Sequence, residues 1–323
     1  MDIHSPNTSR PATLYPPLTP YESGMLDVGD GHEIYWEVSG NPLGKPALFL
    51  HGGPGGGCYA DHRRLFDPDH YRIVLFDQRG CGRSKPVGSL LGNTTQHLVD
   101  DIERLRILLG VESWLLLGGS WGATLALLYA QAHRTRVTAL VLRGVFTARK
   151  REIDWLYRFG ASALFPESWE KFAGFVAADE RADCVSAYFR RLTQGDRDSQ
   201  IAAARAWCAW EGALMTLTPR ALYEPGHGDQ TLALARIETH YFVNNTFLPE
   251  GVIMSKAHLL RGLPGVIVQG RYDVVTPPTT SYELHRAWPE SRLEIVPDAG
   301  HATSEPGTIR KLIEATDGFR LFE

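Results

Sequence analysis

The 323-residue sequence predicts an α/β protein, with a mostly parallel, doubly wound sheet into which a helical segment is inserted. Short apolar runs bounded by Gly or Asp recur along the chain, as is typical of strands that helices cover on both faces. Helical patterns separate these runs. The strand signal stops after about Phe146 and resumes only after about Leu259. One sheet, interrupted by one long insertion, accounts for all three observations.

The N-terminal part predicts an arm and then a hairpin. Residues 1–23 are rich in Pro, Ser and Thr, and we expect them to form an extended arm. The next stretch, "MLDVGDGHEIYWEVSG", alternates apolar and polar residues around Gly29, Asp30 and Gly31. This alternation about a Gly-rich turn is typical of a β-hairpin.

The first half of the sheet follows. Buried strands are predicted at "PALFLHGG", "YRIVLFDQRG", "SWLLLGGS" and "VTALVLRG". The segment "TTQHLVDDIERLRILLG" opens with threonines, repeats Leu and Ile at helical spacing and ends at Gly110, so it predicts a helix. A second helix is expected directly after "GGSWG".

The middle of the chain is aromatic and helical, with patterns such as "DWLYRFGASALF", "AARAWCAWEGALM" and "ALARIETHYF". Strand signals return with "GVIVQGRYD" and "RLEIVPDAGH", before a last helix near "GTIRKLIEATDGF". We therefore expect a core made of residues 24–146 and 260–323, and a helical cap domain made of residues 147–259.

Composition excludes several classes of function. With 43% hydrophobic residues and a net charge of −4, the chain suits a globular protein without a basic groove for nucleic acid or anionic membranes. Neither a signal peptide nor a bilayer-spanning run is recognisable, so a cytoplasmic protein is expected. The four cysteines form no CxxC pair, which indicates free thiols rather than a metal or redox motif. No cofactor is expected, and the oligomeric state is left open.

A candidate nucleophile lies in the motif "GGSWG". Residues 118–122 fit G-x-S-x-G between a predicted strand and a predicted helix. Such a turn holds its central residue in a strained backbone, so the neighbours on both sides must lack bulk. The Ser120 hydroxyl would then lie at a helix N-terminus, which favours developing negative charge. The alternative is a tight turn that serves only strand–helix packing.

A serine nucleophile needs a base, and the base needs an orienting carboxylate. One recurrent arrangement follows the order Ser, Asp, His, with each residue on a loop after a later strand. Here "VIVQGRYD" places Asp273, and "LEIVPDAGH" places His301, just past successive strands. Other histidines fit less well, because His285 lies in a helical pattern and His240 lies in the inserted segment. Asp298 is the rival acid, although we expect it to shape its own loop.

The run "HGGPGGG", residues 51–57, predicts half of an oxyanion hole. Its flexible residues let backbone N–H groups turn toward one point, and the N–H of Trp121 would be the other donor. Gly53 is the leading candidate for the first donor, with Gly52 and Gly55 as alternatives. A phosphate-binding loop is disfavoured because no Gly-Lys-Ser/Thr closes the motif. The histidine of the run is expected to order the loop.

Together, "HGGPGGG", "FDQRGCGRS", "NTTQHLVDDIERLR", "GGSWG" and "GRYD" resemble the proline iminopeptidases, or prolyl aminopeptidases, which are serine peptidases of the α/β-hydrolase fold. The resemblance covers nearly the whole chain beyond the arm, including "VLRGVF", "AWCAWEG" and "ARIETHYF". It implies that N-terminal proline is released from small peptides through a Ser-His-Asp triad and an acyl-enzyme, without a metal.

An enzyme that recognises an N-terminal residue must bind its protonated amine, and a buried ammonium group requires acidic partners. Glu211 and Glu238 are both embedded among aromatic residues, which is unusual for solvated glutamates. The resemblance implies that these two residues hold the imino group and that Arg143 lies close enough to organise them. For Glu238, an ion pair with Arg236 is the alternative.

Phe146, Tyr157 and Phe242 would form an apolar slot for the pyrrolidine ring, although ordinary packing of the cap explains each of them as well. Where relatives have "WYY", this chain has Trp155-Leu156-Tyr157, so one aromatic of the slot is replaced. Two other functions stay open. A related hydrolase of esters or non-proline amides would differ only in the cap, and a non-catalytic binding protein would share the scaffold.

Overall fold

The computed structural model describes residues 13–218 and 228–320, so parts of the predicted arm and cap lie outside the described residues. Within them, eight strands form one sheet in the order β1-β2-β4-β3-β5-β6-β7-β8. The strands are β1 (Glu22–Gly29), β2 (His32–Gly40), β3 (Lys45–Leu50), β4 (Tyr71–Phe76), β5 (Trp114–Ser120), β6 (Val137–Val145), β7 (Gly265–Gly270) and β8 (Ser291–Val296).

The helices alternate with the strands as the patterns predict. The α-helices are α1 (Thr95–Leu108), α2 (Trp121–Ala132), α3 (Lys150–Tyr157), α4 (Ala161–Leu164), α5 (Pro166–Gly174), α6 (Cys184–Thr193), α7 (Arg197–Leu214), α8 (Asp229–Val243), α9 (Val252–Ser255), α10 (Pro278–Ala287) and α11 (Pro306–Gly318). The 3₁₀ turns are η1 (Ala60–Leu65), η2 (Arg134–Arg136), η3 (Ala178–Asp183), η4 (Asn245–Phe247) and η5 (Ala257–Leu260). None of these helices combines the length and the apolar composition that crossing a membrane requires.

The predicted hairpin is confirmed. β1 and β2 pair antiparallel, and all three residues of the turn between them have positive φ angles: 81° for Gly29, 55° for Asp30 and 76° for Gly31. β2 also pairs antiparallel with β4, whereas every other neighbouring pair is parallel. β1 begins at Glu22, so the last two residues assigned to the arm belong to the sheet instead.

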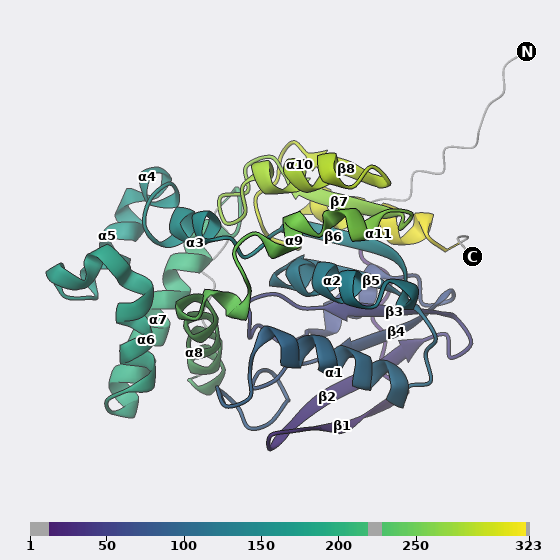
Figure 1. The fold of residues 1–323 in the computed structure, drawn as a ribbon, viewed down its shortest axis with the longest axis horizontal. Coiled ribbons are helices and arrows are strands. Elements are labelled where there is room, and N and C mark those ends of the chain that lie inside the picture. Colours follow the sequence, from purple (N-terminus) through teal and green to yellow (C-terminus); the bar gives the residue numbers. More distant parts are fainter. Residues whose placement is uncertain (1–12, 219–227, 321–323) are drawn as a thin grey trace, which may run out of the picture.

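Helices cover both faces of the sheet, which explains why its central strands are apolar runs. α1, α2 and α10 pack on one face, and α11 packs on the other (Figure 1). η1 packs beside α11 on that second face. Along β5 the side chains alternate between two hydrophobic clusters: Leu116 joins the first, and Leu115 and Leu117 join the second. The fold class predicted from the sequence is therefore confirmed.

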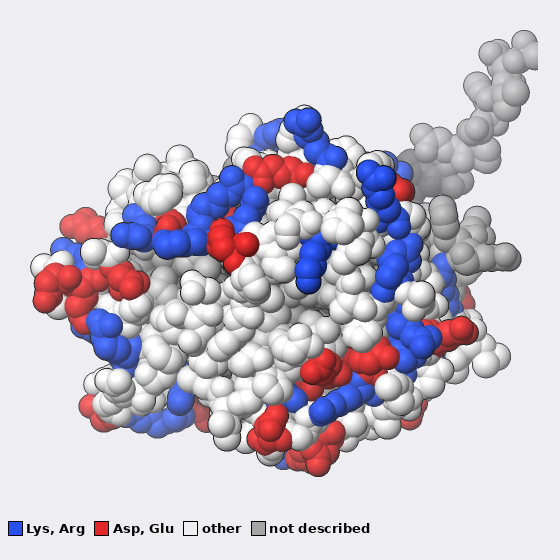
Figure 2. Space-filling model, viewed as in Figure 1, with Lys and Arg blue, Asp and Glu red and all other residues white. Residues whose placement is uncertain are grey.

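All regular elements described between Val145 and Gly265 are helical. Figure 1 shows α3–α8 gathered beside the sheet rather than on either of its faces. The division into a core and a cap domain stays a prediction, and "cap" below means residues 147–259. On the face drawn in Figure 2, acidic and basic side chains are interspersed around a broad uncharged area, as expected from the small net charge.

Candidate active site

Ser120 ends β5 at a sharply turned backbone. Its φ and ψ are 56° and −124°, a conformation that non-glycine residues rarely adopt, and α2 starts at the next residue. A Cβ atom at Gly118 would lie 2.2 Å from the carbonyl oxygen of Gly122, and one at Gly122 would lie 2.0 Å from that of Leu50. Crowding from the adjacent backbone therefore dictates the small residues of "GGSWG", as the motif predicts.

A cavity of about 550 Å³ opens at this edge of the sheet, between the strand ends and the cap. Its lining includes most of the residues predicted for the site: Gly53, Ser120, Arg143, Phe146, Tyr157, Glu211, Glu238, Phe242 and His301. Asp273 lies behind His301, outside the lining. The indole of Trp121 is buried, and its backbone N–H stands at the first residue of α2.

His301 and Asp273 form a buried pair. The His301 Nδ1 atom lies 2.8 Å from Asp273 Oδ2. Asp273 also accepts hydrogen bonds from the Thr276 backbone N–H at 2.8 Å and from the Thr276 hydroxyl at 2.9 Å. Burial alone would raise the pKa of Asp273, but His301 and these donors together hold it below its ordinary value. The rival acid, Asp298, is exposed and has no contact with the imidazole among the described hydrogen bonds.

Arg143 occupies a place that the sequence does not suggest. Its Nη1 lies 2.9 Å from His301 Nε2 and donates to the His301 carbonyl oxygen, also at 2.9 Å. A guanidinium only donates, so Nε2 is the acceptor and Nδ1 carries the proton that faces Asp273. This is the tautomer a general base needs. Within the described residues, no hydrogen bond joins Ser120 to His301.

The expectation that Arg143 organises the two glutamates therefore differs from what is observed. β6 pairs Arg143 with Gly119 on one side and with Val268 on the other. The guanidinium lies so close over Gly119 that a Cβ atom there would be 2.6 Å from its Nη2. Strand register thus directs the side chain toward His301 rather than toward the cap.

We expect Arg143→Met to move the acid limb of the pH profile toward higher pH. The pKa of His301 lies below its ordinary value. Burial is the largest cause, and the positive charge of Arg143 is the next largest cause that lowers it. Removing the cation raises that pKa, so the imidazole becomes protonated, and inactive as a base, at a higher pH. A neutral acetate ester is the substrate to use, because it does not engage the acidic groups of the cap. Arg143→Lys, which keeps the charge, should shift the limb less, and an unchanged limb in the Met variant would contradict this role.

The loop at residues 51–57 runs next to the nucleophile. A Cβ atom at Gly52 would lie 3.4 Å from the Ser120 Cβ and 4.0 Å from its Oγ. His51 orders the loop as expected: its Nε2 accepts from the backbone N–H of Gln78 at 3.0 Å, and its Nδ1 lies 2.9 Å from the Gly52 carbonyl. Burial lowers the pKa of His51, so the ring serves as a neutral brace.

Gln78 connects the glycine loop to Trp121. Its amide Nε2 donates to the His51 carbonyl at 2.9 Å, and its Oε1 accepts from the indole of Trp121 at 3.1 Å. One buried side chain thereby ties the glycine loop to the start of α2. The motif "FDQRG" contains this residue, but its spacing gave no reason to assign it a role.

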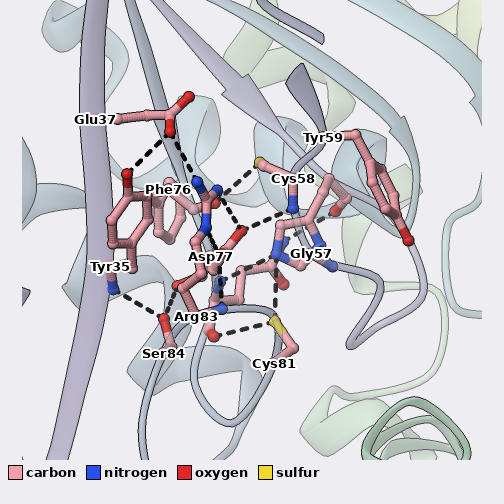
Figure 3. A network of polar contacts seen from close by, with 12 residues as sticks. Tyr35, Glu37, Gly57, Cys58, Tyr59, Phe76, Asp77, Cys81, Arg83 and Ser84 are labelled. Atoms are coloured by element: carbon pink, nitrogen blue, oxygen red, sulfur yellow. Dashed lines mark hydrogen bonds and ion pairs between the residues drawn. The ribbon is translucent and has the colours of Figure 1, made fainter. Parts of the chain in front are cut away.

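Asp77, from the same motif, fixes the far end of the loop (Figure 3). It accepts from the backbone N–H of Cys58 at 2.7 Å and forms an ion pair with Arg83 at 2.7 Å. Arg83 also pairs with Glu37 at 2.8 Å, and its guanidinium carbon lies 3.8 Å from the centre of the Tyr35 ring. The network anchors the turn after β4 against β2, so the glycine loop rests on a rigid support.

Glu211 and Glu238 meet inside the cavity, one from α7 and one from α8. The hydroxyl of Tyr157 donates to Glu211, and the indole of Trp207 donates to Glu238 at 2.7 Å. Burial raises the pKa of both carboxyls, and the charge of Glu211 raises that of Glu238 further. Among the described ion pairs, none joins Glu238 to Arg236.

Aromatic rings lie beside these carboxyls. The Tyr157 and Phe242 ring centres are 5.5 Å apart, and those of Phe146 and Phe242 are 6.3 Å apart. Leu156 lines the same cavity. The four cysteines are free thiols, as expected. Across the described part of the chain, no group of three or more His, Cys, Asp or Glu side chains is placed to hold a metal ion.

Comparison with known proteins identifies close relatives. A family model described as the alpha/beta hydrolase fold matches residues 45–308. A proline iminopeptidase from Xylella fastidiosa is 51% identical over 310 residues, covering 95% of this chain and 99% of that protein. One from Arabidopsis thaliana is 50% identical, covering 94% and 81% of the two chains. One from Neisseria gonorrhoeae is 45% identical, covering 94% and 98%.

Solved structures share the fold at lower identity. An esterase from Exiguobacterium antarcticum superposes with a TM-score of 0.60 at 21% identity, covering 92% of this chain and 98% of that chain. An esterase from a Rhodococcus species gives a TM-score of 0.59 at 21% identity, covering 95% and 100%. At this level of identity the likeness concerns the architecture alone.

Proposed function

The chain belongs to the α/β-hydrolase family and, within it, to the proline iminopeptidases, so we propose that it releases N-terminal proline from small peptides by a serine mechanism. One observation carries the proposal. A single cavity contains Ser120 and His301 together with a pair of carboxyls, the buried Glu238 and the half-buried Glu211. An esterase needs the first two residues, and a substrate with a cationic group would give the second two a charged partner.

Substrate binding uses the charge of the imino group. The prolyl ammonium lies between Glu211 and Glu238, and its arrival stabilises the ionised form of both carboxyls. Burial favours the protonated form of these carboxyls in the free enzyme, so we expect binding of the ammonium to release a proton. The pyrrolidine ring packs against Phe146, Tyr157 and Phe242. Since Leu156 is narrower than an aromatic ring, the slot is wider than the resemblance alone implies.

The chemistry starts when His301 takes the proton of the Ser120 hydroxyl. The oxygen attacks the prolyl carbonyl, and the backbone N–H groups of Gly53 and Trp121 stabilise the oxyanion. Asp273 orients the imidazole and stabilises its positive charge. The bond to Arg143 must give way in this step, because Arg143 Nη1 faces the same nitrogen.

The second half of the cycle reverses these roles. The C–N bond of the tetrahedral intermediate breaks, and His301 gives its proton to the departing amine. Water, activated by the same imidazole, then hydrolyses the prolyl ester of Ser120. Proline leaves, and the serine hydroxyl is restored.

Parallel assays test the proposed function. Prolyl, alanyl and acetyl derivatives of one arylamine or phenol are compared by kcat/KM on the purified chain. Prolyl arylamide should be the best amide by at least about tenfold, because only it fills the slot and also presents a cation to the carboxyl pair. If acetyl and alanyl substrates are cleaved as well as the prolyl one, the chain is a broader esterase or amidase.

Glu238→Gln separates amine recognition from catalysis. We expect kcat/KM for prolyl arylamide to fall by about 100-fold or more, because a buried cation then loses a charged partner. Hydrolysis of a phenyl acetate should change by less than about threefold, since it presents no amine. Equal losses on both substrates would mean that the residue supports the fold or the nucleophile and does not read the amine.

A further inference from the structure

The cavity continues past the nucleophile onto the other side of the sheet. Its cap half contains the carboxyl pair and the aromatic slot. We define its far half by the lining residues Phe49, Tyr59, His62, Leu117, Thr303 and Leu312. None of these residues belongs to the cap, and none has a role in the mechanism above.

The two halves belong to different hydrophobic clusters. Phe49, Leu117 and Leu312 are part of the cluster on the face of the sheet that carries η1 and α11. Phe146 and Phe242 belong to the cluster on the opposite face. Ser120 is the last residue of β5, so it lies at the carboxyl end of this central strand, between the two faces of the sheet. The cavity thus extends over this strand end, with the nucleophile between its halves.

The position of the departing nitrogen indicates which part of the substrate lies in the far half. This step rests on the proposed function: the prolyl ring lies in the cap half, and the departing nitrogen faces His301, which protonates it. The residue that follows the scissile bond must therefore lie beside His301. Ala302, Thr303 and Ser304 come directly after His301 in the chain and line the cavity.

We propose that the far half is the subsite for the residue after proline, and that it takes an uncharged apolar or aromatic side chain. Its floor is apolar, because it is formed by the hydrocarbon side chains of Phe49, Leu117 and Leu312, which are all buried. Its wall is aromatic. The His62 ring stacks on Phe49 with centres 4.1 Å apart, and the Tyr59 ring meets His62 edge-on at 5.5 Å.

The aromatic wall formed by His62 and Tyr59 is uncharged at neutral pH and is partly open to solvent. Burial lowers the pKa of His62 to about 3, so the imidazole carries no charge at neutral pH. Tyr59 is 60% exposed, and Figure 3 shows its ring pointing away from the polar network around Asp77. An aromatic side chain entering from solvent would meet these two rings and then the apolar floor.

A positively charged residue after proline is disfavoured in the far half. No acidic side chain is among the described residues that line the far half, since Glu152, Glu211 and Glu238 come from the cap. Arg143 is the one Lys, Arg, Asp or Glu among the described lining residues outside the cap. A lysine after proline would lose hydration there, and no acidic side chain among the described residues that line the far half would pair with it.

Dipeptide amides test the subsite, because the amide removes any effect of a C-terminal carboxylate. We expect kcat/KM for Pro-Phe amide to exceed that for Pro-Gly amide by about 10-fold to 100-fold, as filling an apolar pocket allows. Pro-Lys amide should be cleaved more slowly than Pro-Phe amide. Equal values for Pro-Phe and Pro-Gly would overturn the subsite but leave the proposed function intact, whereas no proline release from any of the three would overturn the function itself.

Two variants test which residues cause the preference for Pro-Phe amide over Pro-Gly amide. Tyr59→Ala and His62→Ala should each reduce the Phe-over-Gly ratio by about 5-fold or more while Pro-Gly cleavage changes less than about threefold. Tyr282→Ala removes a comparably exposed tyrosine, 55% accessible, that does not line the cavity, so it should leave the ratio unchanged. If Tyr59→Ala and His62→Ala lower both activities equally, the residues support the loop and do not form a subsite.

Discussion

Ser120→Ala should lower the release of proline from prolyl arylamide by about 10⁴-fold to 10⁶-fold, the loss typical of removing a serine nucleophile. The variant keeps the positive-φ backbone of the turn, and the Ser120 hydroxyl makes no hydrogen bond with His301 in the described structure. We therefore expect its thermal unfolding midpoint to stay within a few degrees of the parent. Stopped assays for free proline, at enzyme concentrations high enough to detect residual turnover, measure the loss.

Two controls make this result specific. A serine-reactive phosphonate should label the parent chain and should not label Ser120→Ala. Proline amide should still bind the variant with nearly the parent affinity, because Glu211 and Glu238 are untouched. Turnover within about tenfold of the parent would remove Ser120 from the mechanism, since no other triad serine was predicted.

Asp273→Asn is the second change with a large expected effect, about 10⁴-fold in kcat. An asparagine can keep the shape of the site and its contacts with Thr276, but its amide favours the wrong tautomer of His301. The measurement is kcat for prolyl arylamide and for a phenyl acetate. Both should fall together, because the triad acts in the same way on amides and esters.

Asp298→Asn is the matched control for that experiment. Asp298 lies three residues before His301 in the chain and is exposed, whereas Asp273 is buried and 2.8 Å from the imidazole. We expect less than about a threefold change in kcat, as for most exposed substitutions. A larger loss for Asp298→Asn than for Asp273→Asn would assign the orienting acid to Asp298 instead.

Much of the fold could be predicted because its signals are local. An apolar run bounded by Gly and Asp predicts a strand wherever it lies in the sheet, and each of the runs from β3 to β8 is a strand. β3 to β7 are largely buried, whereas β8, at the edge of the sheet, is largely half-exposed. "GGSWG" could be interpreted in the same way, because the crowding at Gly118 and Gly122 comes from one strand–helix turn and its neighbouring strand. The candidate residues Asp273 and His301 followed from chain order and strand ends alone.

The rest of the site depends on which elements become neighbours. Arg143 contacts His301 across 158 positions of sequence, and only the register of β6 with β5 and β7 sets its direction. The resemblance named Arg143 but placed it with the glutamates, which shows how a shared motif can miss the partner of a side chain. Gln78 likewise acquires its role from two elements that converge on it.

Local pattern therefore decided the strands, the turn that carries Ser120 and the candidate acid and base, since each is set by burial and backbone sterics within a few residues. Tertiary packing alone decided the raised pKa values of Glu211 and Glu238, the contact between Arg143 and His301 and the extension of the cavity to both faces of the sheet. Contacts of that kind depend on strand order and helix docking, which residues adjacent in sequence do not specify.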